Sequence, residues 1–201
     1  NILLEEDIFR TNPQALEKLT GWVNARDAGR QPAAMYAMGS LLLAKDDLAG
    51  AVKMAEDGLS KYPQSLPVQT LSLNTITTLL DKNRVEDAER LISKYPGTSP
   101  GLVFQQGALA FRKGDYPLAQ SLFREAARRA SEKTAESALF NENLAALNAN
   151  DAAGAAALVK EAAGSAQLRE HILFEQAHYA AKRMNPEATE LLAAFVALAE
   201  D

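Results

Sequence analysis

Two histidines and one glutamate are the side chains whose types and spacing could do chemistry in this sequence. His171, Glu175 and His178 follow one another at i, i+4 and i+7, so a helix would place them on one face. Two imidazoles and a carboxylate can bind a divalent metal ion. The sequence shows no evident fourth ligand for such an ion. We therefore interpret the three residues as structural and predict no metal site and no cofactor.

Other catalytic groups are also scarce. The chain has no cysteine, which excludes disulfides and thiolate chemistry. There is no glycine-rich phosphate loop. Because both histidines lie on one late helix, few residues could combine into a catalytic set of nucleophile, base and orienting group. Carboxylate pairs such as Asp46-Asp47 stand at expected helix starts, where they complement the helix dipole. We therefore do not expect an enzyme.

Composition and charge narrow the class of protein. The 201 residues are 47% hydrophobic and 23% charged, with a formal net charge of −5, which indicates a folded chain. Because the basic residues are dispersed, we expect no nucleic-acid partner. The longest apolar stretches, Met35–Ala44 and Leu191–Ala199, are too short to span a bilayer, so no direct membrane insertion is expected. Asn1 is not followed by a basic-then-apolar signal segment, so we expect the natural start to lie upstream. A location in either the cytoplasm or the periplasm of a bacterium is compatible with this sequence.

A repeated pattern organises most of the sequence. In five places a short polar turn precedes a helix start that carries alanine at a fixed offset. The spacings between these alanines are 37, 31, 36 and 33 residues, which average close to 34. A period of this length is typical of a unit of two helices. The anchor alanines are Ala51, Ala88, Ala119, Ala155 and Ala188.

The third unit shows the pattern most clearly. Gly107 stands in the first helix, and Gly114-Asp115-Tyr116 forms the turn. Ala119, Phe123 and Ala126 follow in the second helix. With this spacing the chain resembles the tetratricopeptide repeat (TPR) family over about residues 32–200, and the resemblance implies that the small residue Gly107 lets two helices touch. The resemblance implies an all-α fold, a right-handed α-solenoid of stacked antiparallel helix pairs (a TPR-like superhelix) with about twelve helices.

The repeats divide the sequence into segments. Residues 1–31 are expected to hold N-terminal helices of a truncated preceding repeat, over Ile2–Arg10 and Gln14–Ala28. The second of these helices would turn Leu16, Leu19, Trp22 and Val23 inward. The second repeat departs from the family, because its second helix would run only from about Val85 to Lys94. The five TPR-like repeats are expected at about 32–65, 66–98, 99–133, 134–166 and 167–201.

The resemblance also implies a binding surface. In the family the first helix of each repeat lines a concave face, into which repeat positions 5 and 12 point. We expect an apolar groove for a peptide or helix of a partner protein, although the same side chains could instead pack against neighbouring helices. Position 5 gives Tyr36, Leu73, Phe104, Phe140 and Leu173, position 12 gives Leu43, Leu80, Phe111, Leu147 and Ala180, and the polar border includes Asn74, Gln105, Arg112, Asn141 and Asn148.

The last helix suggests a second contact. It is apolar nearly all round, whereas a terminal repeat needs a polar outer face to stay soluble. We therefore expect further repeats, another domain or a second copy of the chain to cover it, and favour a two-fold homodimer. The residues of this contact are Leu191, Leu192, Phe195, Val196 and Leu198.

These observations lead to a hypothesis for function. We predict a protein–protein interaction scaffold or adaptor. The alternative is a structural segment of a longer bacterial multi-repeat protein, such as an envelope lipoprotein involved in assembly or polysaccharide export, because turns such as residues 44–51 are similar to those of such proteins. An enzyme or ligand-binding domain would rest on His171, Glu175 and His178 alone.

Overall fold

The computed structural model describes residues 13–25, 29–185 and 187–199. These residues form eleven α-helices and one 3-10 helix, and no strand occurs among them. The all-α prediction is therefore confirmed. The helix expected over Ile2–Arg10 lies outside the described residues. The next helix runs over Pro13–Asn24, where Leu19 is buried as expected but Trp22 is 42% exposed, so its inward placement was wrong.

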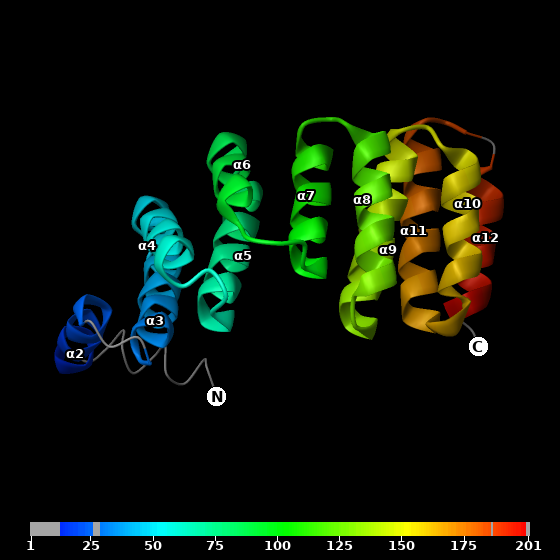
Figure 1. Ribbon diagram of the computed structural model, residues 1–201. Coiled ribbons are helices and arrows are strands. Elements are labelled where there is room, and N and C mark those ends of the chain that lie inside the picture. Colours follow the sequence, from blue (N-terminus) through cyan, green and yellow to red (C-terminus); the bar gives the residue numbers. More distant parts are fainter. Residues whose placement is uncertain (1–12, 26–28, 186, 200–201) are drawn as a thin grey trace. The chain divides into compact units, whose positions relative to one another are not determined.

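The chain divides into two compact units, residues 1–98 and 99–201. The division coincides with the expected boundary between the second and third repeats. In the first unit each helix contacts the next, and contacts also join the first helices α3 and α5 and the second helices α4 and α6 (Figure 1). The bounds are α2 (Pro13–Asn24), α3 (Gln31–Ala44), α4 (Leu48–Lys61), α5 (Leu66–Asp81) and α6 (Val85–Lys94).

The second unit repeats this arrangement. Each helix again contacts the next, and the first helices α7, α9 and α11 contact one another in order (Figure 1). The bounds are α7 (Pro100–Arg112), α8 (Tyr116–Arg129), α9 (Glu132–Asn148), α10 (Ala152–Glu161), η1 (Ala162–Gly164), α11 (Ala166–Lys182) and α12 (Ala188–Ala199).

The same backbone turn follows the first helix of each of the five pairs, namely α3, α5, α7, α9 and α11. One residue of the turn adopts a left-handed conformation, with φ from 53° to 80°. The next residue donates its N–H to the carbonyl five residues earlier, over 2.7–3.0 Å. This pattern is the Schellman motif, which satisfies carbonyl groups that the helix end leaves without partners. The left-handed residues are Asp46, Asn83, Gly114, Asn150 and Met184.

The turns reveal a shift in the fifth repeat. The left-handed residue precedes the anchor alanine by five residues in the first four repeats, but Met184 precedes Ala188 by four. The second helix starts two residues after the left-handed residue in those repeats, whereas α12 starts four residues after Met184. Relative to the turn, Phe174 and Ala181 therefore take the places that the sequence assigned to Leu173 and Ala180. Burial agrees, because Leu173 is 4% exposed and Phe174 is 47% exposed.

Glycine allows close approach of helices at two of the repeated positions. A Cβ atom on Gly39 would lie 2.3 Å from Leu71 Cδ1, and one on Gly107 would lie 2.9 Å from Phe123 Cδ1. Any larger residue would push these buried side chains aside, which costs about 1–3 kcal/mol in a packed core. The glycines therefore fix how closely α3 approaches α5 and α7 approaches α8.

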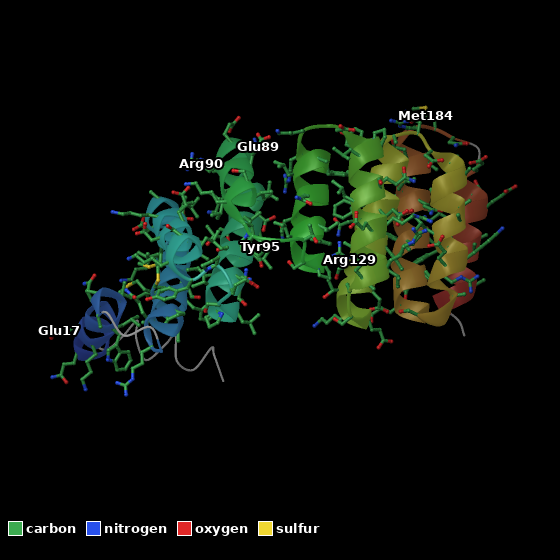
Figure 2. All side chains as sticks on the ribbon, in the orientation of Figure 1. Glu17, Glu89, Arg90, Tyr95, Arg129 and Met184 are labelled. Atoms are coloured by element: carbon green, nitrogen blue, oxygen red, sulfur yellow. The ribbon has the colours of Figure 1, made fainter. Side chains whose placement is uncertain are left out.

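Met184 provides a test of the shared turn. A methionine in the left-handed region is strained, whereas asparagine, found at the matching positions 83 and 150, tolerates it. The Met184 side chain is 92% exposed and extends from the turn after α11 (Figure 2), so its replacement removes little packing. We expect Met184→Asn to raise the free energy of unfolding by about 0.5–1 kcal/mol, measured by urea denaturation. The reverse change, Asn83→Met, should lower it, and a loss of stability in Met184→Asn would contradict this account of the turn.

Candidate functional site

Three phenylalanines occupy one register on the first helices of the second unit. Phe104 on α7, Phe140 on α9 and Phe174 on α11 each lie ten residues before the left-handed residue of the following turn. The first two are half-buried and Phe174 is 47% exposed. Because α7 contacts α9 and α9 contacts α11, the three rings lie on successive neighbouring helices. We call Phe104, Phe140 and Phe174 the phenylalanine row.

Ring contacts hold each member of this row. Phe104 meets Phe123 of α8 edge to face, with 5.3 Å between ring centroids. Phe140 meets His171 of α11 edge to face at 6.4 Å. Phe174 stacks on His178 at 6.2 Å and contacts Phe195 of α12 at 5.6 Å. Such contacts fix the rings while part of their surface stays exposed.

Sequence reasoning found two of these phenylalanines and missed the third. Phe174 was missed because the anchor Ala188 is displaced by one residue relative to the turn. The family-derived position therefore fell on the buried Leu173. The spacing of the phenylalanines themselves, 36 and then 34 residues, could have identified the row.

A second column lies seven residues after the row, next to the turns. It consists of Phe111, Leu147 and Ala181. Phe111 and Leu147 are half-buried, and Phe111 meets Tyr116 edge to face at 5.3 Å. Ala180, which the sequence placed here, is buried at 7% exposure.

The first unit carries matching positions on α3 and α5. Tyr36, Leu43 and Leu73 are half-buried, as surface-lining side chains would be. Leu80 is 3% exposed and belongs to the core, so it does not line a groove.

The expected polar border is only partly at the surface. Asn74 and Arg112 are exposed. Asn141 is half-buried, and its Nδ2 donates to the carbonyl of Ser137. Gln105 is 8% exposed, so it lies in the core and not on a border.

The outer face of α12 is apolar and exposed. Leu192 and Val196 are 45% and 50% exposed, whereas Leu191 and Phe195 are half-buried on the side toward α11. The side chain of Leu198 lies outside the described residues. The expected self-association set is therefore split between an inner and an outer face.

The histidines have aromatic contacts. His171 lies against Phe140 and His178 against Phe174. Within the described part of the chain, no group of three histidine or carboxylate side chains could hold a metal ion. The helices described there include none that is both long enough and apolar enough to cross a membrane.

An ion pair between a partly exposed guanidinium on α8 and a buried carboxylate on α9 joins these two helices. Arg124 Nε donates to Glu142 Oε1 over 2.6 Å, and Arg124 also reaches Glu161 at 3.3 Å. Glu142 is fully buried, and its Oε2 has no hydrogen-bond partner. Burial raises the pKa of Glu142, while the hydrogen bond from Arg124 opposes that rise. The same hydrogen bond raises the pKa of Arg124, so the guanidinium stays charged.

No protein-family model, curated protein or solved structure matches this chain.

The ion pair gives a prediction about pH. Arg124→Ala leaves the buried Glu142 carboxylate without its cation, which should cost about 3–5 kcal/mol near neutral pH. A carboxyl group whose pKa is raised by folding stabilises the protein below its unfolded pKa, and that stability is lost as the pH rises through the folded pKa. The destabilisation of Arg124→Ala should therefore be larger at about pH 8 than at about pH 5, as measured by urea denaturation.

A double variant serves as the control. Arg124→Ala combined with Glu142→Gln has no carboxyl group at position 142 to titrate. Its free energy of unfolding should therefore depend on pH much less than that of Arg124→Ala alone. An equal loss of stability at both pH values in Arg124→Ala would show that Glu142 does not titrate between them.

Proposed function

We propose that this chain is a TPR-like scaffold that binds a segment of a partner protein through apolar side chains on its first helices. Within each unit the helix pairs would stack as a right-handed α-solenoid, with the first helices on the inner, binding face. The observation that carries the proposal is the phenylalanine row, with three rings in one register on α7, α9 and α11.

The row has the properties of a recognition surface. Buried aromatic anchors dominate the binding energy of many protein interfaces. Phe174 leaves nearly half of its surface in water although its neighbour Leu173 is buried. Neighbouring rings held by fixed contacts would present preorganised apolar surface to a helix or an extended segment. In the first unit Tyr36 and Leu73 hold the same register, ten residues before their turns, and would form a similar surface within that unit.

The outer face of α12 favours a second function. Leu192 and Val196 are large apolar side chains about half exposed on neighbouring turns of one helix. Such a face would suit a homodimer contact or the next repeat of a longer bacterial multi-repeat protein. This contact uses a different helix from the partner-binding row, so the two functions are compatible.

Phe174 provides the sharpest test of partner binding. Phe104 packs on Phe123, so its replacement would also disturb the core, whereas Phe174 is 47% exposed. The photoreactive residue p-benzoylphenylalanine at position 174 should form covalent adducts with a partner protein, detected by mass spectrometry. Phe174→Ala should weaken partner capture by about 10-fold or more.

A matched control is available on the second helix α8. Leu118 is 48% exposed, so it is an apolar side chain about as accessible as Phe174. It lies on α8, the second helix of its pair, whereas Phe174 lies on a first helix. The photoreactive residue at position 118 should give few adducts, and Leu118→Ala should leave capture unchanged. Equal adduct yields at both positions, or none at 174, would refute binding along the phenylalanine row.

A further inference from the structure

The outer face of α12 stands at the position of an interface that recurs inside this chain. Within each unit a second helix packs against the first helix of the following pair, as α4 packs on α5, α8 on α9 and α10 on α11. The second helix α12 lies beside its own first helix α11 at the end of the second unit (Figure 1). Among the described helices of this unit, none packs on α12 as α9 packs on α8.

The burial pattern of α12 identifies the residues of its outer face. Ala188, Leu191 and Phe195 are half-buried, and Phe195 contacts Phe174 of α11. Positions counted from the anchor alanine therefore face inward in α12 at the same places as in α8. The matching residues of α8, all buried or half-buried, are Ala119, Leu122 and Ala126.

Two of these counted positions lose their cover in α12. Four residues after the anchor, Ala55 of α4 and Phe123 of α8 are 0% and 1% exposed, whereas Leu192 is 45% exposed. Eight residues after the anchor, Leu59 of α4 is 5% exposed, whereas Val196 is 50% exposed. We call Leu192, Val196 and the exposed Ala193 between them the open face of α12.

The packing of α9 on α8 shows what kind of helix fits such a face. Phe123 shares a core cluster with Ala145 of α9, and Ala126 shares another with Ala138. Ala138, Glu142 and Ala145 follow at i, i+4 and i+7, so they lie on one side of α9. Small residues on the incoming helix thus meet a large apolar side chain on the second helix. Leu192 and Val196 are also large, so the same kind of helix complements the open face.

The residue five positions after the anchor selects the charge of the incoming helix. In α4 this residue is Glu56, which pairs with Arg90 of α6 at 3.2 Å. In α8 it is Arg124, which pairs with Glu142 of α9 at 2.6 Å. In α12 it is the uncharged Ala193. A carboxylate buried against Ala193 would lose its water without gaining a cation, so the open face favours an uncharged helix surface.

Phe174 joins the open face to the phenylalanine row. Its ring contacts Phe195, which lies between Leu192 and Val196 along α12. In the third repeat the matching ring of Phe104 contacts Phe123, the residue that α9 covers. A helix docked on α12 would therefore lie next to the end of the row, on the surface proposed to bind a partner.

A second copy of the chain offers few suitable helices. Its first helices α3, α5, α9 and α11 each already pack against the preceding helix. The occupant that the open face fits is therefore a helix from another protein.

We propose that the open face of α12 binds an amphipathic helix of the partner protein, which packs there as α9 packs on α8. The inference rests on the proposed scaffold function and specifies the partner as a helix with small, uncharged residues at i, i+4 and i+7. Leu192 and Val196 contact this stripe, and the middle residue of the stripe lies against Ala193.

The test uses a fluorescent peptide with the sequence of residues 131–149 that carries the change Glu142→Ala. Its titration into the full chain, followed by fluorescence anisotropy, should give saturable binding with a Kd on the order of 100 μM. Val196→Lys should abolish this binding, whereas the matched control Leu118→Lys, an equally exposed position on α8, should leave it unchanged. No saturable binding, or binding that survives Val196→Lys, would overturn the proposal.

A charge exchange tests the position of the docked helix. The unchanged peptide keeps Glu142 and should bind the chain at least 10-fold more weakly than the Glu142→Ala peptide. Ala193→Arg supplies a cation where α8 has Arg124, so this variant should bind the unchanged peptide at least as tightly as the Glu142→Ala peptide. A preference that Ala193→Arg leaves unchanged would show that the peptide does not pack as α9 packs on α8.

Cross-linking in cells separates the occupants of the open face. The photoreactive residue p-benzoylphenylalanine at position 196 should form adducts with another protein, and mass spectrometry should locate them on a helix with an uncharged small stripe. Adducts between two copies of the chain, cross-links within one polypeptide, or no adducts would overturn the proposal. A dimer in analytical ultracentrifugation that Val196→Lys dissociates would likewise assign the face to a second copy.

The two proposals fail in different ways. If the peptide does not bind α12 but adducts still form at position 174, the scaffold stands and the helix inference is wrong. If the peptide binds with the expected charge exchange and no adducts form at position 174, the open face stands and binding along the phenylalanine row is wrong.

Discussion

The carbonyl groups at the end of each first helix are the constraint on which this structure depends. A helix leaves its last carbonyls without intrahelical partners, and here the chain satisfies them five times with the same two backbone hydrogen bonds. The geometry requires one left-handed residue, which asparagine, aspartate and glycine tolerate far better than methionine. Because the turn fixes where one helix ends and the next begins, it sets which side chains of each first helix share a register. The phenylalanine row is a consequence of that shared register.

Packing within each unit follows from the same regularity. Where a glycine stands on a first helix, a large side chain fills the space, as Leu71 does beside Gly39 and Phe123 beside Gly107. Where α8 meets α9, a buried carboxylate is tolerated because Arg124 lies within hydrogen-bond distance. The cost of burying Glu142 appears as its raised pKa and its unpaired second oxygen. Among the described residues, the buried side-chain atoms that lack a hydrogen-bond partner all lie in the second unit.

The fifth repeat shows how a small departure creates a new surface. The helix α12 starts later after its turn than the other second helices do, and α10 begins with alanine where α4, α6 and α8 begin with leucine, valine and tyrosine. The same departure shifts α11 by one residue relative to the expected pattern, which exposes Phe174 and buries Leu173. A loss of regularity at one turn thus accompanies an accessible ring.

The sequence alone determined the local features of this protein. The spacing of the anchor alanines and the polar turn residues predicted the helices and their turns, because backbone capping depends on a few neighbouring residues. The sequence also placed glycine at a helix contact, since only a missing side chain permits such an approach. It did not determine which apolar residues stay exposed. Leu80 and Gln105 have the spacing of surface positions, yet neighbouring helices bury them.

The tertiary structure decided the register of the fifth repeat and the burial of its side chains. Methionine carries no sequence signal for a left-handed conformation, so the turn at Met184 was visible only in the backbone. Burial and voids depend on what packs against a residue from elsewhere in the chain, and for that physical reason a one-dimensional pattern does not fix them.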